Sequence, residues 1–251
     1  MPHTARTHHD NVERIGGTAA TADGFMARRW NRYYFRTERR TVRDMLAGEI
    51  RPGSSVLDIG TSHGNWLPFL RQVGFNTVLG VELDAGRAEQ ARQAGYDEVY
   101  NCDARSIPRP AESIDAAVSN DVFVHILQLE DKAAVLRETE RLLRPGGVMV
   151  INHSSARAFG YTSAHVEDHC SFLTLDELIR LVRDNSSLII EDVKPSYYSV
   201  MGRPRPRILR NLLMVLPFGG IATSLLDHYV RRRQPIDLSD YVYLKLRKSE
   251  E

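Results

Sequence analysis

The chain has 251 residues, of which 42% are hydrophobic and 26% charged, the composition of a globular protein long enough to bury a core. Its 33 lysines and arginines nearly balance 32 aspartates and glutamates, so no overall charge favours nucleic acid or a membrane surface as a partner. The two cysteines, Cys102 and Cys170, lie in no metal-ligand spacing, so we expect a reducing, cytoplasmic location and no bound metal.

The chain starts with a polar segment followed by a helical one. Residues 1–22 contain no apolar signal sequence, and we expect them to form a loose tail. Residues 23–53 form a second unit, in which apolar side chains at a spacing of three and four predict a helix over 24–49. Its aromatic residues, NRYYF at 31–35, indicate either a lid over a ligand site or part of the core.

From residue 54 onward, short apolar strands alternate with helices. This alternation predicts one α/β domain over 54–251, with a doubly wound, mostly parallel, seven-stranded Rossmann-like sheet. The expected strands are 55–59, 77–81, 98–101, 114–119, 148–152, 188–193 and 241–247, and the expected helices are 66–73, 85–94, 131–143 and 174–183. Residues 153–171 are polar and are expected to form a loop, and the last strand is expected to be antiparallel to its neighbours.

A long insertion over 195–238 precedes the last strand. Its apolar stretch is interrupted by Pro217 and two glycines, so it is too broken for a membrane-spanning helix and predicts two short helices instead. We interpret it as a helical cap over the substrate or as the surface of a homodimer. The alternative is contact of residues 207–233 with a membrane surface, which their basic flanks would favour.

The clearest motif is VLDIGTSHG at 56–64, a strand that runs directly into a turn with two glycines, Gly60 and Gly64. Glu82 ends the second strand, about 20 residues further on, where a carboxylate can accept both hydroxyls of a ribose. Asp103 follows the third strand, where it could accept a hydrogen bond from an adenine amino group. Three successive strand ends therefore predict a nucleoside site.

These residues resemble those of the class I methyltransferases that depend on S-adenosylmethionine (SAM), in the subgroup that acts on small molecules. The resemblance covers residues 54–153 and includes LLRPGGVMVI at 142–151. The family's acidic-x-Gly-x-Gly-x-Gly motif aligns with Asp58, Gly60, Ser62 and Gly64, so that serine replaces the middle glycine.

The resemblance also implies a role for each residue of the cofactor site. Gly60 would contact the methionine part of SAM and Glu82 the ribose, while Asp103 and the amide of Ala104 would hold the adenine. Asn120, at the end of the fourth strand, would lie beside the sulfonium, and Tyr33 would close over the cofactor from the helical lid.

The glycine turn at 60–64 matches neither of two other nucleotide-binding motifs. An NAD-binding domain needs Gly-x-Gly-x-x-Gly, which the spacing from Gly60 to Gly64 does not give. A phosphate-binding loop needs Gly-Lys-Ser/Thr, which is missing. A Rossmann oxidoreductase and a SAM-binding protein without transfer activity remain as alternatives.

Methyl transfer to a hydroxyl is helped by a general base, and histidine suits this role near neutral pH. His153 ends the fifth strand and His125 follows the fourth, and both are candidates. Asp121 is the third candidate, because it could orient His125 or accept the substrate hydroxyl.

Two further patterns lie near these residues. The spacing of His165, Asp168 and His169 is compatible with a metal site, but such loops are usually solvated, and we predict no metal. Residues 120–123 partly resemble a motif of nucleic-acid amino-methyltransferases, but the prolines are missing and we expect no basic stripe.

The sequence therefore predicts a SAM-dependent enzyme that methylates a hydroxyl of a small-molecule acceptor, a sugar or a natural-product intermediate. N-methylation of an amino sugar or another small amine is the alternative within this class.

Overall fold

The computed structural model describes residues 22–196 and 234–250, with side chains from residue 34 onward. The tail expected over 1–22 lies outside the described residues except for Ala22, and so does the insertion over 195–238 except at its two ends. Among the described residues, no helix is both long and apolar enough to cross a membrane.

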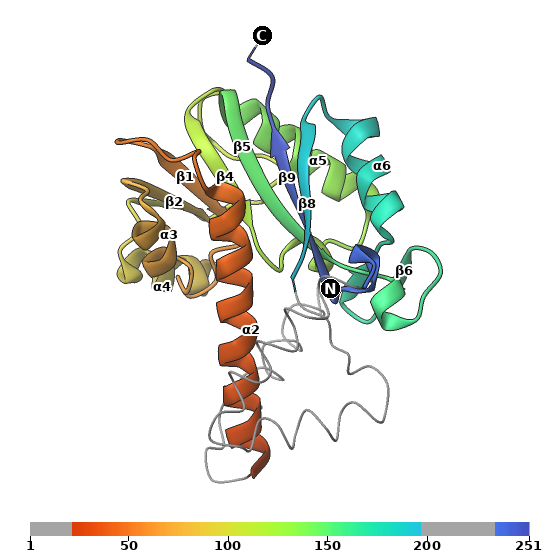
Figure 1. Ribbon diagram of the computed structural model, residues 1–251. Coiled ribbons are helices and arrows are strands. Elements are labelled where there is room, and N and C mark those ends of the chain that lie inside the picture. The colour runs from red at the N-terminus through yellow and green to blue at the C-terminus, as the bar shows by residue number, and fades with distance from the viewer. Residues whose placement is uncertain (1–21, 197–233, 251) are drawn as a thin grey trace.

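The centre of the fold is a seven-stranded sheet with the strand order β3-β2-β1-β4-β5-β9-β8 (Figure 1). Strands β1 to β5 are parallel, and β9 is antiparallel to both β5 and β8. The mostly parallel sheet and the antiparallel last strand are thus confirmed. The strands are β1 (Ser55–Ile59), β2 (Thr77–Val81), β3 (Glu98–Tyr100), β4 (Ile114–Ser119), β5 (Leu143–Ser154), β8 (Ile189–Pro195) and β9 (Tyr241–Arg247).

Helices cover both faces of this sheet. On one face, α2 (Ala22–Leu46), α3 (Leu67–Val73) and α4 (Ala85–Ala94) share a core with residues such as Val150 and Tyr243. On the other face, α5 (Leu129–Leu142) and α6 (Leu175–Asn185) share a core with residues such as Ile151 and Val242. Because side chains alternate along a strand, neighbouring residues of β5 and β9 face opposite helix layers.

The largest difference from the expected elements lies after β5. The loop expected over 153–171 contains a two-stranded hairpin, β6 (His165–Glu167) and β7 (Cys170–Phe172). Its turn consists of Asp168 and His169, and Asp168 adopts the left-handed region with φ 52°. Strands of three residues give too short a pattern to be recognised in the sequence.

The boundaries of several other elements also differ. Strand β5 begins directly after α5, so that the Pro-Gly-Gly turn at 145–147 lies within β5, and His153 belongs to this strand. Helix α6 has the capping box expected from Thr174 and Glu177, in which the Thr174 hydroxyl accepts from the backbone amide of Glu177 and the Glu177 carboxylate accepts from the backbone amide of Thr174. Three short 3-10 helices are also described: η1 (Phe123–His125), η2 (Arg157–Phe159) and η3 (Ile236–Leu238).

Candidate cofactor and acceptor site

The glycine turn after β1 needs glycine for packing as well as for its backbone conformation. Gly60 has φ 79°, and a Cβ atom there would lie 2.3 Å from Cγ2 of Val122. Gly64 has φ 84°, and its Cβ atom would lie 2.7 Å from that of Ala94 in α4. Ser62 stands between them with φ 49°, a left-handed conformation that favours glycine, the residue that the motif of the resembled family has at this position.

Asp58 supports the turn from inside the protein. Its side chain is buried, and the hydroxyl of Tyr96 donates a hydrogen bond of 2.5 Å to its carboxylate. Burial raises the pKa of Asp58 to about 7. The structure therefore places Asp58 beneath the turn, where it fixes the end of β1.

Glu82 lies next to this turn, at the end of β2. Its two carboxylate oxygens accept hydrogen bonds from the backbone amides of Ser62, at 2.9 Å, and Asp84, at 3.0 Å. A carboxylate can accept about four hydrogen bonds, so these two leave capacity for the two hydroxyls of a ribose. The arrangement of Glu82 therefore fits its expected role.

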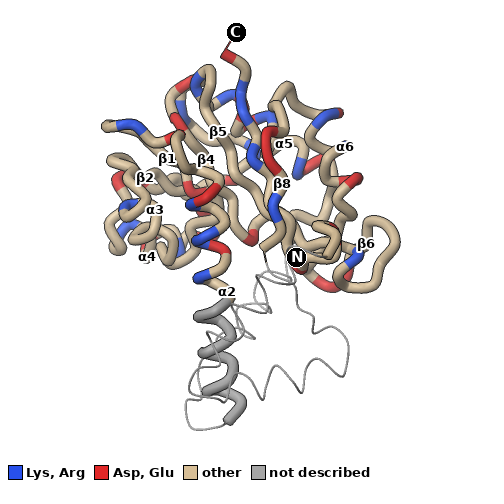
Figure 2. The backbone as a smooth tube through the Cα atoms, viewed as in Figure 1, with Lys and Arg blue, Asp and Glu red and all other residues tan. Residues whose placement is uncertain are grey.

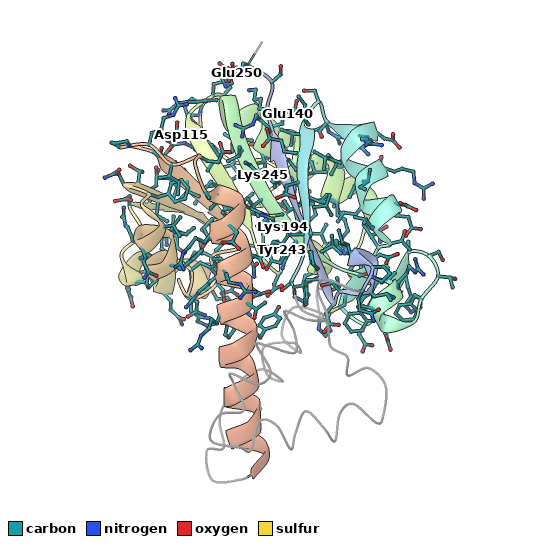
Figure 3. The ribbon with its side chains drawn as sticks, in the orientation of Figure 1. Asp115, Glu140, Lys194, Tyr243, Lys245 and Glu250 are labelled. Carbon is teal, nitrogen blue, oxygen red and sulfur yellow. The ribbon has the colours of Figure 1, made fainter. Side chains whose placement is uncertain are left out.

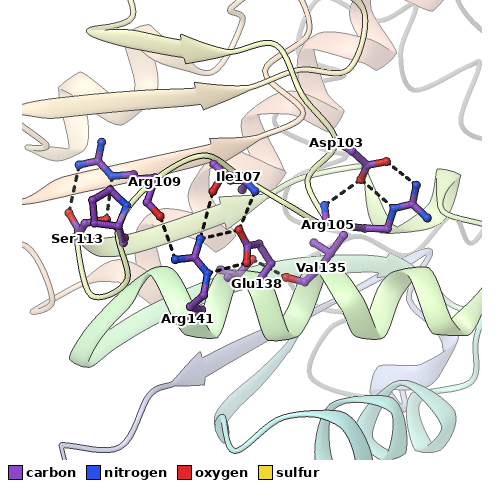
Figure 4. A network of polar contacts seen from close by, with 10 residues as sticks. Asp103, Arg105, Ile107, Arg109, Ser113, Val135, Glu138 and Arg141 are labelled. Atoms are coloured by element: carbon purple, nitrogen blue, oxygen red, sulfur yellow. Dashed lines mark hydrogen bonds and ion pairs between the residues drawn. The ribbon is translucent and has the colours of Figure 1, made fainter.

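Asp103 lies in the loop after β3, where Arg105 binds it (Figure 4). One oxygen accepts from the backbone amide and Nε of Arg105, both at 2.9 Å, and the other accepts from the same guanidinium at 2.6 Å. Hydrogen bonds from Arg105 lower the pKa of this carboxyl, so it is ionised near neutral pH. Asp103 is half-exposed, and the partly buried Ala104 follows it directly.

A buried polar network joins the end of β4 to α2 and β9. Asn120 donates to Glu38 of α2 at 3.3 Å and accepts a hydrogen bond of 2.6 Å from the hydroxyl of Tyr243. That hydroxyl also lies 3.2 Å from the other oxygen of Glu38. Figure 3 shows Tyr243 in the central part of the fold, on β9. Glu38 is fully buried, and its carboxyl joins three segments that are distant in the sequence.

The network continues to Asp121, the next residue along the chain. Asp121 has φ 59°, and its carboxylate accepts hydrogen bonds from Tyr34 of α2, at 2.8 Å, and Asn152 of β5, at 2.9 Å. The side chain of Asn152 also accepts from the backbone amide of Asp121, at 2.7 Å. Asn152 therefore fixes both the backbone and the carboxylate of Asp121.

The two acids of this network have raised pKa values. Burial raises the pKa of Glu38 well above its usual value, and the nearby carboxylate of Asp121 adds to the effect. Burial also raises the pKa of Asp121, while hydrogen bonds from Tyr34 and Asn152 oppose this rise. The sheet edge beside Asn120 therefore holds a carboxyl group with increased affinity for a proton.

Three residues of this network, Glu38, Asn152 and Tyr243, are not among the site residues predicted from the sequence. Glu38 had a recognisable signal, since it occupies an apolar position of the helical pattern, four residues before Val42. The side chain of Tyr33 lies outside the described residues, whereas that of its neighbour Tyr34 binds Asp121.

His153 lies on the opposite face of the sheet from Asn152. It is fully buried, its Nδ1 lies 2.9 Å from the carbonyl oxygen of Ser154, and its Nε2 has no hydrogen-bond partner among the described residues. Burial, with a contribution from Lys132, lowers the pKa of His153 to about 3. An imidazole with this pKa is a weak base at neutral pH.

His125 is exposed in η1, where it lies beside the β6–β7 hairpin. Its ring stacks on that of His169 with centroids 5.7 Å apart, and its Nδ1 lies 4.0 Å from the sulfur of Cys170. His165 instead stacks on Tyr161, at 3.9 Å. Of the three residues whose spacing suggested a metal site, only His169 joins this group.

The expectation that no basic stripe exists is wrong for α2. Four arginines at a spacing of three and four line a hollow of about 550 Å³ between α2 and α3, and blue segments mark α2 in Figure 2. The guanidinium of Arg43 lies 5.5 Å from the centre of the Phe69 ring within this hollow. The arginines of this basic stripe are Arg36, Arg39, Arg40 and Arg43. The overall charge of the chain does not indicate this basic stripe, because acidic residues elsewhere in the chain offset its arginines.

The profile of a family described as "Methyltransferase domain" matches residues 28–186, more than half of the chain. The probable tRNA methyltransferase 9B of Mus musculus is 30% identical over 166 residues, which cover 66% of this chain and 34% of that protein. The 27-O-demethylrifamycin SV methyltransferase of Amycolatopsis mediterranei is 31% identical over 119 residues, which cover 43% of this chain and 42% of that protein.

A solved structure has the same fold. The O-methyltransferase from a trans-AT PKS multienzyme of Brevibacillus brevis, in complex with S-adenosyl-L-homocysteine, superposes with a TM-score of 0.58 at 18% identity. The match covers 88% of this chain and 75% of that one. By contrast, the chain spans about a third of the length of the mouse relative and less than half of the Amycolatopsis one.

Proposed function

The chain belongs to the class I SAM-dependent methyltransferases, and we propose that it methylates a hydroxyl group of a small molecule, a sugar or a natural-product intermediate. The observation that carries this proposal is the position of Asp121 beside Asn120, at the end of β4. By family resemblance the sulfonium would lie at this edge, and burial raises the pKa of Asp121 there. A hydroxyl acceptor needs a group that can take its proton, and a carboxylate with a raised pKa suits this task.

The cofactor would be held by the three strand ends of the nucleoside site. Glu82 would accept the ribose hydroxyls, and Asp103 with the amide of Ala104 would bind the adenine. Leu83 is 71% exposed directly after Glu82, which offers an apolar surface on which the base could pack. When bound, SAM would supply an electrophilic methyl group.

The residues of the chain would supply the proton acceptor and its orientation. Asp121 accepts the proton of the acceptor hydroxyl, while Tyr34 and Asn152 hold its carboxylate in one position. We place Asp121 before His153 as the base, because His153 is buried and its pKa is lowered to about 3. His125 is exposed and is the second candidate.

We propose that residues 23–53 act as the lid of this site. Helix α2 supports this role, because it contributes both Tyr34 and Glu38 to the network around Asn120 and Asp121. A helical cap formed by residues 195–238, and a homodimer built on the same segment, are further proposals.

The decisive experiment measures transfer of a radiolabelled methyl group from SAM to panels of sugars, hydroxylated natural products, amino sugars and tRNA. We expect label in a hydroxyl compound. Asp121→Asn should lower kcat about 100-fold with little change in SAM affinity, since general-base groups typically contribute 10²–10⁴-fold. Asparagine also tolerates a left-handed backbone, so this variant should fold. Asp44→Asn, on the exposed surface of α2, is the matched control.

Each of the other outcomes would contradict part of the proposal. Full activity of Asp121→Asn together with a slow His125→Ala enzyme would make His125 the base. Label only in amino sugars would support N-methylation, and SAM binding without transfer to any panel would support a non-catalytic protein.

A tRNA acceptor is the second candidate function, and the basic stripe of α2 favours it. Arginines bind phosphate groups well, and the mouse relative is named as a probable tRNA methyltransferase. Label in tRNA that is lost in the variant Arg36→Gln/Arg40→Gln would replace the small-molecule proposal.

A further inference from the structure

Three side chains with metal-binding atoms converge where η1 meets the β6–β7 hairpin. Each of the three residues, His125, His169 and Cys170, offers one ligand atom, and these three atoms lie within 4.8 Å of one another. Cys170 Sγ and His125 Nδ1 are 4.0 Å apart. A tetrahedral zinc ion with bonds of about 2.0–2.3 Å separates such atoms by about 3.5 Å, so small side-chain movements would complete the geometry.

The backbone around these side chains is held rigidly. The buried ammonium of Lys132 donates to the carbonyl oxygens of Phe123 and Ile126 and, at 2.8 Å, to the hydroxyl of Ser171. That hydroxyl also lies 3.0 Å from the carbonyl oxygen of Val124. The residues on either side of His125 are thereby bound to the residue next to Cys170. These bonds hold the backbone that carries His125 next to the backbone that carries Cys170 before any ion binds.

The third ligand position is set by the hairpin turn. Asp168 and His169 form a two-residue turn, and Glu167 pairs with Cys170 across it. With this register, His169 is the last residue of the turn and Cys170 the first residue of β7, so the imidazole and the thiol stand on adjacent residues opposite η1. Glu167, the last residue of β6, and Asp168, the first residue of the turn, precede Cys170 by three and two residues, and their negative charges favour a cation there.

We propose that His125, His169 and Cys170 bind a divalent metal ion of the zinc class. Two imidazoles and one thiolate form a donor set that suits zinc and cobalt and is poorly matched to magnesium or calcium. Three protein ligands leave a fourth position of the tetrahedron for water or an oxygen of a bound molecule. A metal-bound His125 could not serve as a general base. This inference is independent of the methyl acceptor, because it concerns ion binding alone.

Cobalt titration of the purified full chain tests the proposal, because a thiolate bound to Co²⁺ gives an intense near-ultraviolet absorption band. We expect one equivalent of Co²⁺ to bind with this band and to be displaced by Zn²⁺. The band should be lost in Cys170→Ser, and the affinity should fall at least tenfold in His125→Ala and in His169→Ala. The matched controls Cys102→Ser and His165→Ala should bind as the wild type does. A band that persists in Cys170→Ser, or no binding by the wild type, would overturn the proposal.

A second measurement tests the proposal even if the Cys170→Ser variant fails to fold. The Cys102→Ser protein retains a single thiol, that of Cys170. Zinc should slow its reaction with a thiol reagent at least tenfold, and it should do so without SAM or any acceptor. An unchanged rate at saturating zinc would contradict the metal site, whatever the outcome of the methyl-transfer assay.

Discussion

At the scale of single residues, Asn152 and His153 are neighbours on β5 whose side chains lie on opposite faces of the sheet. Asn152 faces α2 and holds Asp121, whereas His153 faces α5 and is buried near Lys132. Burial disfavours the charge of both His153 and Lys132, and the pKa of Lys132 falls to about 7. One step along a strand thus separates a residue of the candidate site from a residue of the core.

The lowered pKa of His153 predicts how stability changes with pH. The imidazole of His153 takes up a proton near pH 6.5 in the unfolded chain, but only near pH 3 in the folded chain. Because the unfolded chain binds the extra proton between these two pH values, a fall in pH within this window favours unfolding. Between pH 7 and pH 5 this residue should cost about 2 kcal/mol of stability. His153→Leu cannot titrate, so its free energy of unfolding should fall by about 2 kcal/mol less than that of the wild type over this interval. Urea unfolding at both pH values measures the difference, and equal falls would show that His153 titrates normally.

At the scale of elements, the attachment of α2 to the sheet depends on polar groups as well as on its apolar face. Val42, Met45 and Leu46 are buried beneath the helix, and Glu38 joins Asn120 and Tyr243 one turn earlier. Beyond the helix end, Glu49 forms ion pairs with Lys245 and Arg247 of β9. Helix α2 and the residues directly after it are therefore fixed to β9 and to Asn120.

Substitution of Glu38 tests this attachment. Its raised pKa means that the folded protein keeps the proton at a pH where the unfolded chain has lost it, so wild-type stability should fall as the pH rises above about 4.5. Glu38→Gln keeps the hydrogen-bonding shape without a charge and should weaken this fall. Glu38→Ala should lose about 1–3 kcal/mol, because it leaves buried partners unsatisfied. Thermal unfolding from pH 5 to pH 8 measures both, and a wild-type slope retained in Glu38→Gln would argue against a protonated Glu38.

At the scale of the whole molecule, the parallel strands bring residues distant in the sequence to one edge. Gly60, Glu82 and Asn120 each follow a different strand, and β1, β2 and β4 are adjacent in the sheet. Carboxyl ends of adjacent parallel strands are a general place for ligand sites in such folds. The candidate cofactor site thus depends on the topology of the complete sheet.

Binding of SAM to this edge should stabilise the whole fold. At a concentration 100 times its dissociation constant, the gain is about 2.7 kcal/mol and should appear as a rise in Tm. NAD should give no rise. Glu82→Gln should reduce the SAM-dependent rise, while Glu89→Gln, on the exposed surface of α4, should preserve it. A full rise in Glu82→Gln would remove Glu82 from the cofactor site.

Much of the fold follows from local patterns in the sequence. The strands at Ser55–Ile59, Thr77–Val81 and Ile114–Ser119 were predicted at their exact bounds, because each is a short apolar run next to a glycine or polar turn. The hairpin at 165–172 was missed, because its strands are too short to show a period. Glu82 and Asp103 could be selected as candidate cofactor residues from their places after strands, whereas Glu38 and Tyr243 could not be connected to Asn120.

The sequence by itself determined the order of strands and helices, the glycine turn and the family, because these depend on residues close together in the chain. The tertiary structure decided which polar groups meet. It placed Asp121 against Tyr34 and Asn152, buried His153, and brought Cys170 to His125, residues 45 positions apart. The physical reason is that burial and long-range contacts set the pKa and the partners of a side chain, and both arise only when the sheet and its helices have packed.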